Sequence, residues 1–251
     1  RANFLLGKTL TKLQRYPEAL TSYEAYIELR PGILDSHVYE LRGDLFDTLG
    51  DKEQALINWE EAYTVDPHGG NEELAVKIAR VYQQRGDTET ALSLYKDIYH
   101  NSGSDYIKAQ MNILVGRIYL NQEDPESAIP YFQDTVTNFP HTGDAQTALA
   151  ALDNQAVEVN QYQRGLVNYY AQNYPMAIEA FQSYLEQGAE EFADAALYHQ
   201  ALATRAVQNN GDANGSEAAI ALWQTLISDF PTSSYYIDAW GDIEFTQWDY
   251  L

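Results

Sequence analysis

Alanine and a large aromatic residue recur along the chain four positions apart. The pattern occurs six times, at Ala19/Tyr23, Ala55/Trp59, Ala91/Tyr95, Ala128/Phe132, Ala177/Phe181 and Ala219/Trp223. Residues four apart lie on one face of an α-helix, so each pair predicts the buried face of a helix. Successive alanines are 36, 36, 37, 49 and 42 residues apart, which indicates one supersecondary unit per period. The sequence therefore predicts a repeat protein whose function resides on a surface rather than in a pocket.

A small residue precedes the alanine in each of the first five units, at Gly7, Gly43, Ala79, Gly116 and Gly165. Two antiparallel helices approach closely only where their contact residues are small, while aromatic side chains fill the wider groove between neighbouring units. Proline cannot continue a helix, so Pro31, Pro67, Pro140 and Pro231 are expected to end second helices. This arrangement resembles the tetratricopeptide repeat. The resemblance implies an all-α fold, a right-handed α-solenoid superhelix of about six helix pairs with one extra inserted helix.

The repeat pattern predicts four parts. Residues 1–140 hold four repeats, the alanine-rich segment 141–157 adds a helix, residues 158–231 hold two further repeats, and residues 232–251 form a C-terminal helix that either caps the array or begins a truncated repeat. The polar, glycine-containing segment 209–216 predicts a loop.

The composition excludes several classes of function. With 37 acidic and 15 basic residues the formal net charge is −22, which disfavours binding to nucleic acid and to anionic membrane surfaces. The chain has no cysteine, which excludes disulfides and thiolate catalysis and is consistent with an exported protein. We therefore expect an extracytoplasmic or periplasmic location, with a cytoplasmic one left open. No apolar run is long enough to insert into a bilayer, no signal peptide is visible, and the chain opens at Arg1, which suggests a portion of a longer protein.

Motifs for catalysis, metals and cofactors give no site. Asn210, Asp212 and Asn214 match the first half of a calcium-loop spacing, but Ala221 stands where the bidentate glutamate is required. The histidines show no metal-binding spacing, so a solvated position is the default for each of them. No glycine-rich phosphate loop occurs. We expect no catalytic residue, no metal ligand and no cofactor.

The resemblance implies that first helices line a concave groove. On that register the groove is formed by Lys8, Lys12, Glu40, Asp44, Asp47, Arg80, Gln83, Arg117, Asn121, Tyr162, Leu166 and Tyr169. The spacing of Glu40, Asp44 and Asp47 places three carboxylates together on one helix face. The family's carboxylate clamp for chaperone C-termini requires asparagine where this chain has Lys8, Asp44 and Arg80, so that specialised role is rejected.

Repeats without catalytic motifs predict a noncatalytic scaffold that binds a protein or an extended peptide, as part of a larger bacterial cell-envelope protein. The oligomeric state is left open. The alternative is the helical domain of a peptidoglycan lytic transglycosylase, because residues 162–181, 195–199 and 217–223 are similar to the helical regions that precede such catalytic domains. The chain lacks the Gly-Leu-Met-Gln stretch of those catalytic domains and is not expected to cleave glycan. A third reading is an envelope assembly factor, because the helix pairs that end in Asn-Phe-Pro140 and Asp-Phe-Pro231 resemble those of such factors.

Overall fold

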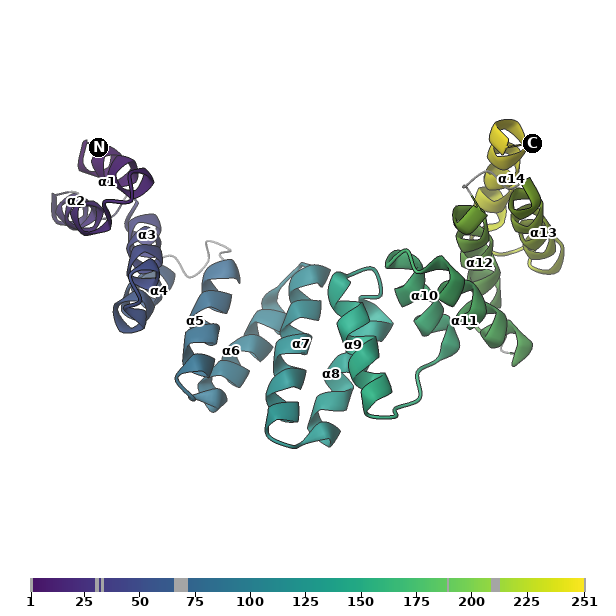
Figure 1. Cartoon of the computed structure of the whole chain (residues 1–251), viewed down its shortest axis with the longest axis horizontal. Helices are drawn as coiled ribbons and strands as arrows, with labels where there is room; N and C mark the ends of the chain where they lie inside the picture. Colours follow the sequence, from purple (N-terminus) through teal and green to yellow (C-terminus); the bar gives the residue numbers. More distant parts are fainter. Residues whose placement is uncertain are drawn as a thin grey trace. The chain divides into compact units, whose positions relative to one another are not determined.

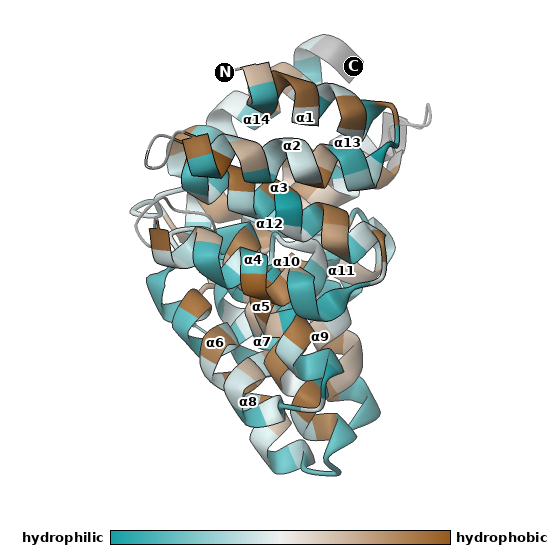
Figure 2. Ribbon diagram, turned by 90° about the vertical axis from the view of Figure 1, so that its left-hand side faces the viewer, coloured by the Kyte–Doolittle hydropathy of each residue, from teal (hydrophilic) through white to brown (hydrophobic). Residues whose placement is uncertain are grey.

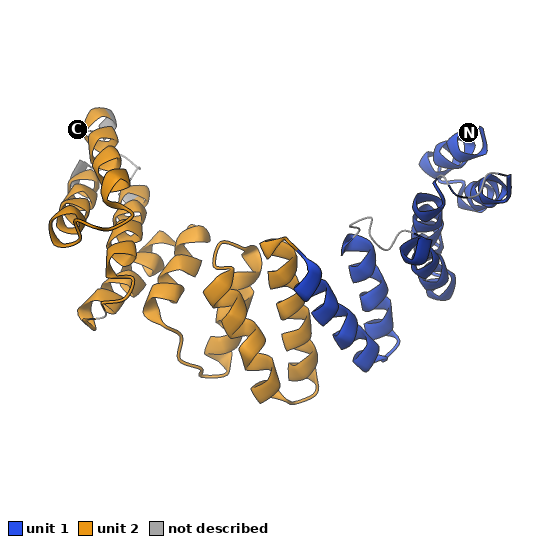
Figure 3. Ribbon diagram, turned by 180° about the vertical axis from the view of Figure 1, so that it is seen from behind, with its two compact units in different colours: residues 1–102 blue, residues 103–251 orange. Residues whose placement is uncertain are grey.

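The computed structural model describes residues 2–29, 32, 34–65, 72–188, 190–208 and 213–250. At the ends of the last range, residues 213, 214, 249 and 250 are described by their backbone alone. The chain divides into two compact units, residues 1–102 and 103–251 (Figure 3). Every regular element of the described residues is an α-helix (Figure 1). The all-α class predicted from the sequence is therefore confirmed.

The described residues of unit 1 form three helix pairs. The paired helices are α1 (Ala2–Lys12) with α2 (Tyr16–Leu29), α3 (Asp35–Thr48) with α4 (Lys52–Val65), and α5 (Glu72–Gln84) with α6 (Thr88–Asn101). The helices are amphipathic, and Figure 2 shows hydrophobic and hydrophilic segments alternating along them. Each helix buries its apolar stripe on its partner or on the next pair, as expected when every repeat unit stabilises its neighbours.

Unit 2 contains three more pairs and two single helices. The pairs are α7 (Asp105–Asn121) with α8 (Pro125–Asn138), α10 (Gln161–Tyr170) with α11 (Tyr174–Glu186), and α12 (Ala193–Gln208) with α13 (Ala213–Asp229). The single helix α9 (Gly143–Asn154) packs on α7, α8 and α10, and α14 (Tyr236–Tyr250) packs on α13. Helix α9 falls within the segment 141–157. The division into four parts stays a prediction. The two compact units are defined by contacts between residues, so they do not test where one repeat ends and the next begins.

The core follows the alanine and aromatic pattern of the sequence. All six alanines have no exposed surface, and the six aromatic partners are at most 4% exposed. The glycine of the first helix lies directly beneath the aromatic ring in four pairs. A Cβ atom built on Gly43 would lie 2.3 Å from Cδ1 of Trp59, and one built on Gly165 would lie 2.5 Å from Cδ1 of Phe181. Only glycine permits so close an approach, which explains the small residue at this position.

The turns within five of the helix pairs share a left-handed backbone conformation. Gly50 and Gly86 adopt φ of 84° and 83°, and Gln14, Glu123 and Gln172 adopt φ of 58°, 60° and 62° at the equivalent place. Glycine adopts this region without steric cost, whereas residues with a Cβ rarely do. Two of these turns therefore use glycine, and the other three form the same turn without it.

Helix ends agree with the sequence only in part. Helices α8 and α13 end just before Pro140 and Pro231, as predicted, while Pro31 and Pro67 lie outside the described residues. The loop predicted at 209–216 is wrong for residues 213–216, which form the first turn of α13. Gly215 and Ser216 are buried there, so tertiary packing outweighs their weak intrinsic helix preference. Residues Asn210 and Asp212 of the considered calcium loop lie outside the described residues.

Candidate binding surfaces

The two lysines predicted on the first helix remain exposed. Lys8 and Lys12 lie on the surface of α1, and Nζ of Lys8 is 5.6 Å from the centroid of the Phe4 ring. An ammonium over an aromatic face is held by a weak cation–π attraction. These lysines form a small basic area in unit 1 that is open to an acidic group of a partner.

The predicted carboxylate face of α3 is largely used inside the protein. Nζ of Lys77, on α5, donates to Oδ1 of Asp44 at 2.8 Å and to Oε1 of Glu40 at 3.4 Å. Nε1 of Trp59 donates to the same oxygen of Asp44 at 3.1 Å, and Lys77 also lies 5.6 Å from the Trp59 ring centroid. Burial alone would lower the pKa of Lys77, but the hydrogen bond and the charge of Asp44, assisted by Glu40, raise it. Lys77 therefore stays protonated and joins two neighbouring repeats.

Sequence reasoning missed Lys77, although the repeat register contained a signal for it. Lys77 lies between Val76 and Arg80, the positions of the third unit that correspond to Glu40 and Asp44. A basic residue next to these positions on α5 faces the two carboxylates of α3. The third predicted carboxylate, Asp47, forms an ion pair with Lys52 across the turn of its own pair. The three acids therefore do not form one free acidic site.

The next predicted residues lie apart from that cluster. Arg80 is exposed on α5, while Oε1 of Gln83 accepts a hydrogen bond from the Tyr95 hydroxyl at 3.0 Å. Burial raises the pKa of Tyr95 to about 12, which keeps this hydroxyl protonated as a donor. Arg117 and Asn121 are exposed on α7, in unit 2. Gln83 is therefore structural, whereas Arg80, Arg117 and Asn121 are accessible to a partner.

The strongest candidate surface lies in unit 2, around the two tyrosines that the sequence predicted on α10. We call it the tyrosine face and define it by six aromatic side chains on α10, on α12 and just before α14: Tyr162, Tyr169, Tyr170, Tyr198, His199 and Tyr235. Tyr170 is 47% exposed, His199 is buried, and the other four are half-buried. The predicted groove residue Leu166 is partly buried beneath them, in the cluster around Phe181.

The rings of the tyrosine face form a continuous series of contacts. The centroid of Tyr169 is 5.4 Å from that of Tyr170 and 5.4 Å from that of His199. His199 lies 5.8 Å from Tyr235, which in turn stacks on Tyr198 at 4.7 Å. Aromatic pairs at such distances stabilise one another in tilted or offset geometry. The face is therefore fixed by its own packing before any partner binds.

Tyr162 extends the tyrosine face at its other end. Its ring stacks on Phe192 with centroids 5.0 Å apart and planes within 4°. Burial raises the pKa of Tyr162 well above its usual value, with smaller contributions from Tyr235, Tyr170 and Asp194. The ring contacts of Tyr169 with His199 and of His199 with Tyr235 bring α10, α12 and the residue before α14 together at this face.

A polar network lies along one edge of the tyrosine face. The Tyr198 hydroxyl donates to Oδ2 of Asp242 at 2.9 Å, and a guanidinium nitrogen of Arg205 donates to Oδ1 of the same carboxylate at 2.8 Å. Burial first, and then the hydrogen bond to Asp242, raise the pKa of Tyr198. The Ser233 hydroxyl donates to Oδ2 of Asp194 at 2.6 Å. These bonds fix the orientation of Tyr198 and join α12 to α14.

His199 corrects a sequence expectation. Its side chain was expected in solvent, but it lies on α12 among the rings of Tyr169, Tyr198 and Tyr235 with 8% of its surface exposed. Nδ1 is 2.8 Å from the carbonyl oxygen of Ala195, and because a carbonyl only accepts, Nδ1 carries the proton. Burial lowers the pKa of His199 despite this hydrogen bond. The imidazole is therefore neutral at pH 7 and acts as a member of the aromatic layer.

The tyrosine face offers uncharged hydrogen-bonding groups beside apolar ring surface. Because the pKa values of Tyr162, Tyr169, Tyr198 and Tyr235 are raised, all four hydroxyls stay protonated at neutral pH. Aromatic rings of this kind bind apolar, proline and cationic groups at low entropic cost. The chain after Arg205 contains acids but no lysine or arginine.

Four members of the tyrosine face were not predicted there: Tyr170, Tyr198, His199 and Tyr235. The signal for Tyr198 is its spacing, because it follows Tyr162 by 36 residues, the period of the repeat. Residues one period apart occupy the same place on successive first helices and lie side by side. Tyr170 has no such counterpart.

Within the described ranges, no cluster of three His, Asp or Glu side chains could hold a metal ion. No helix that the structure describes has both the length and the apolar character needed to cross a membrane.

Comparison with known proteins identifies the class. The model of the tetratricopeptide repeat family matches residues 4–71 and 76–142, more than half of the chain. The chain belongs to the tetratricopeptide repeat family, whose repeats serve as scaffolds for protein–protein interaction. None of the curated protein sequences matches it significantly.

Several solved structures of the family are similar at low identity. A tetratricopeptide repeat protein from Parabacteroides merdae is 14% identical, with 99% of this chain and 86% of that chain covered and a TM-score of 0.47. The C-terminal part of a repeat protein from Cytophaga hutchinsonii is 15% identical, with 94% and 98% covered and a TM-score of 0.45. The yeast Sti1 TPR2AB domain, in its pHSP90 complex, is 14% identical, with 98% and 97% covered and a TM-score of 0.35. At these values they add nothing to the functional argument.

Proposed function

We propose that the chain is a noncatalytic scaffold that binds an extended, basic segment of a partner protein on the tyrosine face. The observation that carries the proposal is the continuous series of rings from Tyr169 through His199 and Tyr235 to Tyr198. Large aromatic side chains that are already fixed in place contribute strongly to binding, because little conformational entropy is lost.

The polar groups of the face support an extended peptide in particular. Neutral tyrosine hydroxyls can donate to the carbonyls and accept from the amides of a peptide backbone, while the rings contact alternate side chains. Asp194 lies beside the rings, the carboxylate of Asp242 is already paired with Arg205, and no lysine or arginine occurs after Arg205. Charge complementarity therefore favours lysine or arginine in the bound segment.

The test selects ligands without assuming a partner. A displayed library of random 15-residue peptides is selected on the full chain, and the affinities of the selected peptides are measured by calorimetry. We expect Tyr170→Ala and Tyr235→Ala to weaken binding at least about tenfold, since truncating a central aromatic residue typically costs 1.4 kcal/mol or more. Tyr63→Ala is the matched control, because Tyr63 is similarly exposed at 43% but lies in unit 1.

Two results would contradict this function. If the selected peptides bind the Tyr170 and Tyr235 variants as tightly as the parent chain, the tyrosine face is not the site. If their affinity rises with added salt, the partner segment is not basic, because screening weakens attraction between opposite charges.

A further inference from the structure

The ring contacts of the tyrosine face continue beyond it, toward the start of α7. The ring centroid of Tyr170 lies 6.0 Å from that of His141, with the planes at 75°. His141 in turn lies 5.7 Å from Tyr106, with the planes at 87°. An unbroken series of rings therefore leads from Tyr106 through Tyr170 and His199 to Tyr198, and we call it the aromatic row.

The inserted helix α9 explains why these rings meet. Helix α9 packs on α7, α8 and α10. His141, two residues before α9 begins, contacts the first turn of α7, where its Nε2 is 3.4 Å from Oδ2 of Asp105 and its ring lies against that of Tyr106. Tyr170, the last residue of α10, contacts the same imidazole. The insertion thus joins the tyrosine face to the N-terminal end of α7.

This end of the aromatic row is open to solvent. Tyr106 is 63% exposed, Tyr170 is also exposed, and half of the Asp105 side chain is accessible. Both rings therefore retain area that a ligand can cover, and the Asp105 carboxylate can accept further hydrogen bonds. At the opposite end of the row the carboxylate of Asp242 is largely buried and paired with Arg205. Accessible aromatic rings beside an accessible carboxylate are suited to binding an organic cation.

We infer that Tyr106, Tyr170 and Asp105 form a subsite for an arginine side chain of the extended segment that binds the tyrosine face. The inference rests on the function proposed above and adds the residue that this end of the row selects. A guanidinium is planar, so it can lie flat on a tyrosine ring and donate two hydrogen bonds to one carboxylate, whereas a lysine ammonium acts as a point charge. The charge of unit 2 favours the same ligand, because its sequence contains four lysine and arginine residues and twenty aspartate and glutamate residues.

The aromatic row also sets the length of the bound segment. Six centroid-to-centroid steps of 4.7–6.0 Å separate Tyr106 from Tyr198. An extended chain advances about 3.3 Å per residue, so about ten residues are enough to follow the whole row. The arginine in the subsite is therefore expected near one end of the segment, because Tyr106 lies at one end of the row.

The test uses the 15-residue peptides selected on the full chain. Each arginine of a selected peptide is replaced in turn by methionine, and calorimetry gives the affinities for the parent chain and for Asp105→Asn. We expect Asp105→Asn to weaken the unmodified peptide at least about threefold, as is typical of an accessible ion pair. It should leave the affinity of one methionine peptide unchanged, and that peptide identifies the arginine in the subsite. Tyr106→Ala should also weaken the unmodified peptide at least about threefold, because it removes a ring that the guanidinium covers.

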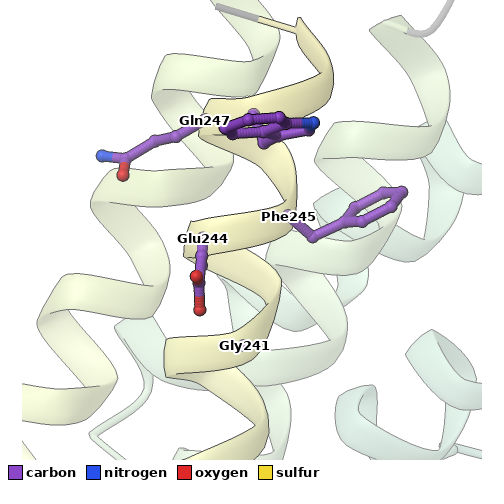
Figure 4. A pocket seen from close by; sticks show the side chains of 5 residues that line it. Gly241, Glu244, Phe245 and Gln247 are labelled. Carbon is purple, nitrogen blue, oxygen red and sulfur yellow. The ribbon is translucent and has the colours of Figure 1, made fainter.

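Two control variants separate the subsite from general effects. Glu126→Gln is the control for Asp105→Asn, because Glu126 is an exposed acid in the first turn of α8, as Asp105 is in the first turn of α7. It removes the same charge from the same place on a helix. Trp248→Ala is the control for Tyr106→Ala, because Trp248 is an exposed aromatic residue of unit 2 in a hollow lined by residues of α14 (Figure 4). Both controls should leave the affinity unchanged.

The outcomes distinguish this inference from the function on which it rests. If Tyr235→Ala weakens binding but Tyr106→Ala and Asp105→Asn do not, the tyrosine face binds its segment without the subsite, and the inference is overturned. The inference is also overturned if no selected peptide contains arginine, or if lysine in its place binds equally well. If neither Tyr235→Ala nor Tyr106→Ala has an effect, the proposed function fails together with the inference.

Discussion

Adding one methyl group to two glycines of unit 2 should change stability in opposite directions. Gly165 lies inside α10 and Gly241 inside α14, and Gly→Ala removes the same backbone entropy at each. At Gly241 the new Cβ meets no described atom within 4 Å, so only the helix preference counts. Gly241→Ala should raise the free energy of unfolding by about 0.5–1 kcal/mol.

At Gly165 the packing cost exceeds that gain. The new Cβ would lie 2.5 Å from two ring atoms of Phe181, whereas carbon atoms make favourable contact only from about 3.5 Å. Phe181 would have to move by about 1 Å, yet it has no exposed surface and lies against Tyr162 and His199. Overpacking of this kind costs about 1–3 kcal/mol. Gly165→Ala should therefore lower stability by about 1–2 kcal/mol after the helix gain is subtracted.

Thermal and urea unfolding followed by circular dichroism measure both variants. For a unit of this size, 1 kcal/mol corresponds to about 2–4 °C in Tm, so the two Tm values should fall on opposite sides of the parent. Equal m values would show that the denatured state is unchanged. The reasoning is refuted if both variants shift in the same direction, since the contact with Phe181 would then not decide the sign.

Three further predictions concern charged and titratable groups. The pKa of His199 is lowered in the fold, so the parent chain should lose stability as pH falls below about 6.5, the usual histidine pKa. His199→Leu should flatten this dependence of stability on pH. A variant that loses as much stability in acid as the parent would argue against the buried imidazole. Arg205→Met should lower stability by about 1–3 kcal/mol in urea titrations, because it leaves the partly buried Asp242 without its cation, and an unchanged midpoint would count against this ion pair. Lys77 has a raised pKa, so its contribution is complete below its usual pKa of about 10.4 and is lost as pH rises above that value. Lys77→Met should remove this alkaline loss, while a curve parallel to that of the parent would contradict the pairing with Asp44.

The helix pairs could be predicted from the sequence because one physical constraint is repeated. Close helix contact requires a small residue such as Gly165 against a large one such as Phe181, and the constraint leaves a fixed spacing that is visible without a structure. The N-terminal turn of α13 could not be predicted in this way. Gly215 and Ser216 favour a loop locally, and their burial in the folded unit outweighs that preference.

The candidate surfaces were predictable only where they followed the repeat. Tyr162 and Tyr169 were placed correctly on a first helix, but their neighbours on the tyrosine face depend on contacts between helices. Lys77 shows the limit most clearly, because the repeat register places it beside the position equivalent to Glu40, but the sequence does not show that its side chain turns toward Glu40 and Asp44. Such pairings depend on how far each helix is rotated about its axis and shifted along it relative to its neighbour. Packing determines both.

The left-handed turns have a consequence for the order of folding. Gln14, Glu123 and Gln172 adopt positive φ without being glycine, at a cost of about 1 kcal/mol each in an isolated chain. A turn that is unfavourable by itself cannot nucleate the hairpin of two helices. We therefore expect the helices of these three pairs to associate through their apolar faces first, and the turn to close last. The pairs with Gly50 and Gly86 are free of this cost, so their turns are able to form early and to guide the helices together.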